Sequence, residues 1–181
     1  MTPPLRSMTL TVLLSVALSP VLVAQGNQSG PPTNPACPLL LDHELDTATG
    51  LDYGPGEGID IGQGAFGGST CLWGGMGGDP AKDLPQVGVV LIPPGSLGSH
   101  TEFYHARTPQ AGCTREALRG LGDLAFVDSC EKAQRGVRVY VKTGKNDVFL
   151  VIDQLQQRPL SWAQPVAVAL AKAAAPRARK Q

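Results

Sequence analysis

Residues 120–153 read GLGDLAFVDSCEKAQRGVRVYVKTGKNDVFLVID, and this stretch decides the fold. Val137, Val139 and Val141 alternate with polar or amphipathic residues, and this period of two predicts a strand with one face toward solvent. The run 148–152 is apolar at every position, which is typical of a strand covered on both faces. Five turn-forming residues, 143–147, separate the two runs, so the stretch predicts an antiparallel hairpin.

Other segments extend this hairpin into an α+β domain. Apolar runs predict strands at 69–73 and 86–92, and a further strand begins at Leu124 and precedes Cys130. Helices are predicted over 37–50, after the capping box 99–102, and over 165–175, the last begun near 161–165 and ended by Pro176. Together these elements predict an antiparallel sheet of about five to six strands flanked by short helices, an α/β/α sandwich.

The N-terminus has the pattern of a secretory signal. Arg6 precedes an apolar run from Met8 to Val23, and cleavage is expected after Ala24. The alternative, a membrane anchor, is disfavoured because the run is short and contains hydroxyl residues and a proline. The expected organisation is therefore a signal peptide (1–24), a flexible linker (25–36), one domain (37–175) and a basic disordered tail (176–181). The protein is expected to be exported, periplasmic or extracellular, and not integral to the membrane after cleavage.

The charge balance argues against nucleic acid as a partner. The chain has 15 basic and 15 acidic residues, and removing Arg6 with the signal leaves 14 − 15 = −1. The last ten residues hold four basic side chains, so the body without them is 10 − 15 = −5. Phosphate binding needs clustered Lys and Arg, which this body lacks. The basic end could touch a phospholipid surface or an acidic polymer, although a loose terminus is the favoured interpretation.

Four cysteines, an even number in an exported chain, predict two disulfides. They are Cys37, Cys71, Cys113 and Cys130, and three pairings are possible. We favour Cys37–Cys71 and Cys113–Cys130 because each pair joins neighbours in the chain. A zinc site is the alternative, but no two cysteines are closer than 17 positions, whereas zinc sites use closely spaced pairs.

Residues 62–67 match the pattern G-x-G-x-x-G, which could be mistaken for a nucleotide-binding motif. A dinucleotide site requires a strand before these glycines and a helix after them, and a kinase requires further catalytic segments. Here the glycines lead into the strand-like run 69–73, and no kinase segment follows. We therefore predict no nucleotide and no cofactor.

Titratable residues also suggest metal or catalytic sites, and each has a simpler explanation. His43, Glu44 and Asp46 fit a solvated helix face. His100 and His105 are five residues apart and would not share a helix face, so we predict no metal. Asp123 follows two nearby glycines and fits a turn residue better than a catalytic acid. The alternatives are weak metal binding by Met76, His100 and His105, or a hydrolase site assembled from distant residues.

Several short motifs occur in an order that resembles a known family. They are Cys37 with Leu39 and Leu40 before an acidic helix ending at Gly50, then Cys71-Leu72-Trp73, then GLGDLAF before a closing hairpin and helix. This order is similar to a family of bacterial exported domains of unknown function, many of them lipoproteins, which are compared in fold to PsbP-like sandwiches. The resemblance implies a sheet flanked by helices, a Cys37–Cys71 pair and no established catalytic residues. The chain departs from the family in lacking a lipid-attachment cysteine and in carrying Cys113 and Cys130.

These observations favour a non-catalytic binding module over an enzyme. The candidate binding surface is the pair of glycine-rich segments that hold Phe66, Trp73 and Met76, because mobile loops with apolar residues often form contacts. The expected partner is a protein or a cell-envelope component. Under the alternative interpretation Trp73 is plain core, packed on the Cys37–Cys71 bridge. We expect Trp73→Ala to unfold the domain and Met76→Ala to leave it folded.

Overall fold

The computed structural model describes residues 34–59, 68–76, 78–94, 109, 111–132 and 135–181, and the fold is given for these residues. In chain order the elements are η1 (Cys37–Leu39), α1 (Asp42–Thr49), β1 (Glu57–Ile59), β2 (Ser69–Trp73), β3 (Gln86–Ile92), β4 (Cys113–Ala117), β5 (Leu124–Cys130), β6 (Gly136–Thr143), β7 (Asn146–Asp153) and α3 (Leu160–Ala178). The predicted helix after residues 99–102 and the glycine motif at 62–67 lie outside the described residues.

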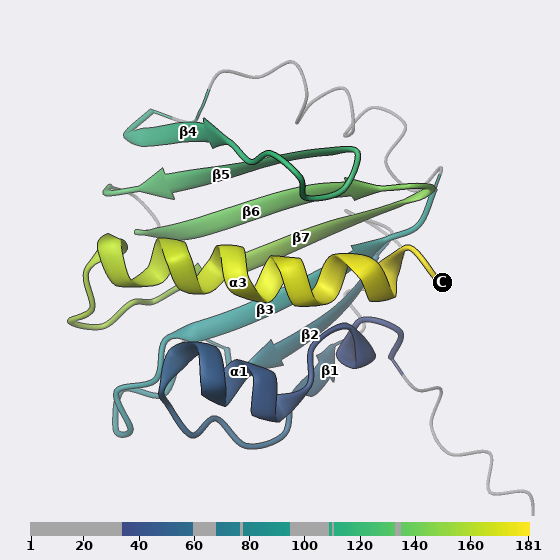
Figure 1. Cartoon of the computed structure of the whole chain (residues 1–181). Coiled ribbons are helices and arrows are strands. Elements are labelled where there is room, and N and C mark those ends of the chain that lie inside the picture. Colours follow the sequence, from purple (N-terminus) through teal and green to yellow (C-terminus); the bar gives the residue numbers. More distant parts are fainter. Residues whose placement is uncertain (1–33, 60–67, 77, 95–108, 110, 133–134) are drawn as a thin grey trace, which may run out of the picture. The chain divides into compact units, whose positions relative to one another are not determined.

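The strands form one open antiparallel sheet in the order β1-β2-β3-β7-β6-β5-β4 (Figure 1). The α+β class and the antiparallel sheet are confirmed, but the sheet has seven strands instead of five to six. The two strands without a sequence signal are β1, which is three residues long, and β4. Both end the described sheet, where one strand edge has no neighbour that could impose an apolar pattern.

The β6–β7 hairpin is the centre of the sheet, as its sequence predicted. Val137 pairs with Ile152, Val139 with Leu150 and Val141 with Val148, so three buried pairs line one face. The loop between the strands is shorter than predicted, because Thr143 and Asn146 already pair across it. The buried Asn146 side chain donates to the Ala178 carbonyl at 2.7 Å, which explains why a turn-forming residue type belongs to a strand here.

One face of the sheet carries the main core. Its members come from β2, β3, β5, β6 and β7 and pack against α3, α1 and η1; they include Cys71, Trp73, Val87, Val89, Val127, Val139, Leu150, Leu39, Leu45, Leu170 and Ala174. Figure 1 shows α3 crossing in front of the central strands, with α1 beside it on the same side of the sheet. The described helices thus cover one face only, and the described part of the chain lacks the three-layer sandwich that the sequence predicted.

The opposite face of the hairpin differs from the prediction. Tyr140, expected to point toward solvent, is only 1% exposed. Its ring stacks on Phe126 with 5.2 Å between centroids, and the Arg115 guanidinium lies 3.9 Å from the Phe126 centroid. Cross-strand aromatic and cation–π contacts of this kind bury a face that alternation alone assigns to water.

The predicted helix over 37–50 is two elements. The 3-10 turn η1 ends at Leu39, and α1 begins at Asp42 after an extended Leu41. Gly50 ends α1 as predicted, in the left-handed conformation with φ 71°, and donates its N–H to the Asp46 carbonyl.

The C-terminal helix runs further than the sequence predicted. Pro176 was expected to end it and to begin a disordered tail, but α3 continues to Ala178. Arg177 forms two hydrogen bonds with the Glu44 carboxylate of α1, both at 2.6 Å, and a third with the Leu39 carbonyl. A proline near the last turn removes only one backbone donor, and these contacts compensate for it.

The structure places the cysteines at disulfide distance in the favoured pairing. Cys37 and Cys71 join η1 to β2, and Cys113 and Cys130 join two directly paired residues of β4 and β5. Within the described residues, no cysteine is free. The first bridge lies against the main core, and the second lies at the far end of the sheet.

Candidate functional site

The structure does not place the proposed surface residues together. Trp73 is 2% exposed, and its indole N–H donates to the Asp42 carboxylate at 2.9 Å, so it belongs to the core as the alternative interpretation held. Met76, three residues later, is 82% exposed. Phe66 lies outside the described residues.

A small hollow of about 400 Å³ lies beside the loop that carries Met76. Gly74, Gly75 and Tyr53 are among the residues that line it. The Tyr53 hydroxyl is buried without a hydrogen-bond partner among the described residues, and desolvation raises its pKa well above the ordinary value. One lysine, Lys82, is among the residues that line this hollow, and its ammonium nitrogen lies 4.0 Å from a carboxylate oxygen of Asp79. The positive charge in the hollow is therefore largely compensated.

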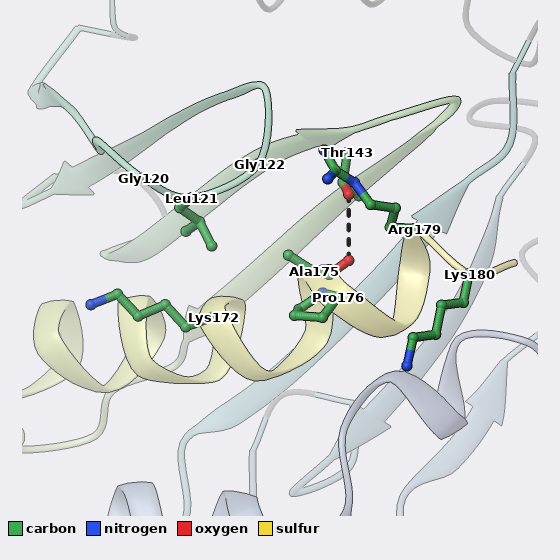
Figure 2. Close-up of a pocket in the computed structure, with 9 residues that line it drawn as sticks. All are labelled: Gly120, Leu121, Gly122, Thr143, Lys172, Ala175, Pro176, Arg179 and Lys180. Atoms are coloured by element: carbon green, nitrogen blue, oxygen red, sulfur yellow. Dashed lines mark hydrogen bonds between the residues drawn. The ribbon is translucent and has the colours of Figure 1, made fainter.

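The larger candidate site lies along α3, on the side that faces β4 and the β4–β5 connection. Two neighbouring hollows, of about 620 and 560 Å³, share Lys172 and together form what we call the α3 groove. The first, drawn in Figure 2, is lined by Gly120, Leu121, Gly122, Thr143, Lys172, Ala175, Pro176, Arg179 and Lys180. The second is lined by Glu116, Leu118, Ser161, Gln164, Pro165, Val168, Ala169 and Lys172.

The turn above the first hollow depends on glycine. Gly122 has φ +66°, and a Cβ there would lie 2.3 Å from the Lys142 carbonyl oxygen. Only glycine therefore lets the turn lie against β6, because a side chain would collide with backbone in a conformation it already disfavours. This turn leaves Leu121 only 6% exposed, where it forms part of the apolar wall.

Asp123 fixes the end of the same turn. Its carboxylate accepts from the Gly144 N–H at 2.6 Å and from Arg179 at 2.8 Å, so both oxygens are used by the protein. Asp123 therefore ties the turn to the hairpin tip and to the end of α3, in agreement with its predicted role as a turn residue. The Arg179 charge is largely compensated by this pair, although both side chains are about half exposed.

Two cations of the first hollow remain without a carboxylate. Among the residues that the structure describes, neither Lys172 nor Lys180 forms an ion pair. Figure 2 shows Lys172 at one end of the hollow and Arg179 at the other, beside Thr143, while the Lys180 side chain extends from the end of α3 away from Leu121. Between them lie apolar atoms of Leu121, Ala175 and Pro176. The hollow thus combines positive ends with an apolar wall.

A polar bridge spans the second hollow. The Gln164 amide donates to Glu116 of β4 at 3.1 Å, and the Gln164 carbonyl oxygen accepts from the Ser129 hydroxyl of β5 at 3.2 Å. These bonds fix the first half of α3 against the edge of the sheet.

Two prolines within α3 also leave backbone carbonyls without the usual donor. Pro165 and Pro176 have no N–H, so the carbonyls of Ser161 and Lys172, four residues earlier, lack their helical hydrogen bonds.

The residues that line the two hollows include two hydroxyl side chains, Ser161 and Thr143. The Thr143 hydroxyl donates to the Ala175 carbonyl at 3.4 Å, and no histidine lines either hollow. Across the described chain, no three His, Cys, Asp or Glu residues gather where they could hold a metal ion. His100 and His105, the basis of the metal and hydrolase alternatives, lie outside the described residues.

This groove was not predicted from the sequence. Lys172 gives the available signal, since it is a single charge within the alanine-rich, otherwise apolar segment 165–175. A lone lysine there marks the exposed side of the helix. The glycines at 120 and 122 were interpreted as turn residues, and nothing in the pattern indicated which helix the turn faces.

Comparisons with protein-family models, curated proteins and solved structures found no match to this chain. Among the described helices, none is both long and apolar enough to cross a membrane. The site must therefore be interpreted from its own geometry.

Proposed function

We propose that the chain is an exported, non-catalytic binding module that holds an acidic segment of a partner protein in the α3 groove. One observation carries this proposal. The 620 Å³ hollow is lined by Lys172 and Lys180, neither of which forms an ion pair with another described residue, and by apolar atoms.

The chemistry of the groove favours a protein segment that has both carboxylates and apolar side chains. Lys172 and Lys180 attract negative charge, and burial of the exposed Pro176 by a partner gains hydrophobic free energy. Neither feature alone would define a partner, but a short acidic segment with one apolar anchor satisfies both. Interfaces commonly combine an apolar centre with a polar rim in this way.

Nucleic acid fits the same surface poorly. Binding to phosphates requires several clustered cations, whereas among the described residues that line this hollow two lysines have no ion pair and Arg179 is already held by Asp123.

Two disulfide pairs support export, because such bridges persist in oxidising compartments. The resemblance to exported PsbP-like domains points in the same direction. Under this proposal the partner is another exported protein or a proteinaceous component of the cell envelope, and the residues 1–24 act as a cleaved signal.

The test is a titration of the mature, oxidised chain with short peptides that alternate Glu or Asp with Leu or Phe, followed by NMR amide shifts. We expect shifts confined to Gly120–Gly122 and to the last turns of α3. The double variant Lys172→Glu/Lys180→Glu should weaken binding by roughly tenfold or more, as expected when two attractive charges become repulsive.

Lys132→Glu is the matched control, since Lys132 is exposed and lies outside both hollows. It should bind the peptides as the unmodified chain does. The proposal is wrong if no acidic peptide shifts the groove residues, or if Lys132→Glu weakens binding as much as the double variant.

A further inference from the structure

The Cys113–Cys130 bridge differs from Cys37–Cys71 in what surrounds its sulfurs. In each pair one cysteine is fully buried and the other is partly exposed: Cys130 and Cys71 are 0% exposed, whereas Cys113 and Cys37 are intermediate. Arg138 distinguishes the two, because its guanidinium donates to the Cys130 sulfur at 3.0 Å. In the described part of the chain, no comparable contact joins a cation to the sulfur of Cys71 or Cys37.

The position of the bridge in the sheet also matters. Cys113 opens β4, which ends the described sheet and pairs with β5. Cys71, in contrast, lies within β2, which has a neighbour on each side, and Cys37 packs against the main core. Cys113 therefore lies on a strand that ends the described sheet, whereas Cys71 lies on a strand with a neighbour on each side.

We infer that Cys113–Cys130 is a thiol–disulfide exchange site for a dithiol reductant, with Cys113 as the sulfur attacked and Cys130 as the leaving group beside Arg138. This inference is independent of the α3 groove and of the partner proposed for it.

The exchange balances as follows. A thiolate of the dithiol attacks the Cys113 sulfur, a mixed disulfide forms, and the bond to Cys130 breaks with its electron pair on the Cys130 sulfur. The second thiol of the reagent then attacks the reagent's first sulfur, which is bonded to Cys113 in the mixed disulfide, and Cys113 is released. Two electrons pass from the dithiol to the bridge, the reagent becomes a disulfide, and its two protons appear on the released thiols or in solvent.

Arg138 favours this direction because a positive charge stabilises the departing thiolate, and a better leaving group departs faster. Other charges surround it. Asp153 of β7 lies near Arg138, and burial raises the pKa of that carboxyl; the Asp128 carboxylate is held by Arg115 in two bonds of 2.7 Å. The guanidinium is thus the charge that directly contacts the leaving sulfur.

The exchange is reversible in this fold. Five consecutive residue pairs hold β4 to β5, from Cys113–Cys130 to Ala117–Phe126. These backbone bonds do not depend on the bridge, so both thiols remain opposite each other after reduction. Re-oxidation then needs no rearrangement of the chain.

The test uses the mature, oxidised full chain, exposed for timed intervals to limiting dithiothreitol, alkylated and mapped by peptide mass spectrometry. We expect Cys113 and Cys130 to be alkylated several-fold faster than Cys37 and Cys71. With glutathione, the trapped mixed disulfide should be on Cys113. Equal rates for the two bridges, or an adduct on Cys130, would overturn the inference.

Variants separate the charge from the fold. Arg138→Gln should slow opening of Cys113–Cys130 at least roughly threefold, while Arg138→Lys, which keeps the charge, should remain close to the original rate. Arg119→Gln removes an equal charge from an exposed position and should have no effect. If Arg138→Gln opens at the original rate, or Arg119→Gln slows opening equally, Arg138 does not have this role. If the Arg138→Gln variant does not fold, the opening rate of Arg138→Lys and the comparison of the two bridges in the unmodified chain still test the inference.

Discussion

At the residue scale, Asp42 and Trp73 show how one polar contact can fix a large apolar side chain. The Asp42 carboxylate accepts from the Trp73 indole at 2.9 Å and from the Gly56 N–H at 3.3 Å. Gly56 has no side chain, and a Cβ there would lie 2.5 Å from the indole ring. Trp73 therefore has a defined place under the segment that follows α1.

Asp42→Ala should lower the free energy of unfolding by about 1–3 kcal/mol, because the buried indole N–H loses its acceptor. Asp42→Asn keeps an acceptor and should cost less. Urea unfolding followed by far-UV circular dichroism measures both. Asp52→Ala, at an exposed carboxylate, is the control and should stay within about 0.5 kcal/mol; an equal loss in both variants would show that the indole contact contributes nothing.

At the element scale, the sequence predicts what burial dictates. The strands β2, β3, β5, β6 and β7 each carry apolar runs or alternation, and all five were expected. β4 could not be found this way, because the polar residues Thr114, Arg115 and Glu116 fill its centre, and the contacts of Arg115 and Glu116 are ionic, cation–π or hydrogen-bonded. Its partner β5 and the opposite cysteines determine that it is a strand.

The candidate site was less predictable than the fold. The α3 groove joins residues about 50 positions apart, from Gly120 to Lys172, and only the packing of α3 on the sheet brings them together. The proposed surface of Phe66, Trp73 and Met76 rested on glycine-rich composition, which gives no orientation for a side chain. Trp73 turned inward because the largest apolar side chain of β2 gains most from burial.

The tie between α1 and α3 yields a pH-dependent prediction. The Arg177 guanidinium, bonded to Glu44, holds the pKa of that carboxyl below its ordinary 4.5. The Glu44–Arg177 pair therefore adds to the free energy of unfolding above pH 4.5. This contribution is lost as the pH falls through the lower pKa of Glu44 in the folded state. Glu44→Gln should reduce the free energy of unfolding by about 1 kcal/mol at neutral pH, given the partial exposure of the pair.

Urea unfolding at several pH values tests this tie. The difference between Glu44→Gln and the original chain should shrink toward zero as pH falls below 4.5. Glu131→Gln, at an exposed glutamate that forms no ion pair with another described residue, should show no such difference at any pH. A Glu44→Gln difference that stays constant or grows on acidification would contradict the assignment.

At the scale of the whole molecule, two bridges constrain two ends of one sheet. Cys37–Cys71 spans 34 positions and joins η1 to β2, while Cys113–Cys130 spans 17 and joins β4 to β5. In the chain-entropy model, loops of these lengths contribute about 3–4 kcal/mol each. For a domain of this size that contribution is a large share of the total stability. Disulfides of this kind persist in oxidising compartments.

The central claim is that this sheet, with its α3 groove, folds as an exported and oxidised chain. The most direct measurement is non-reducing peptide mass spectrometry of the mature protein isolated from its native source. We predict an N-terminus at Gln25, and peptides linked as Cys37–Cys71 and Cys113–Cys130. Retention of residues 1–24, four free thiols, or crossed linkage between the two pairs would contradict the account.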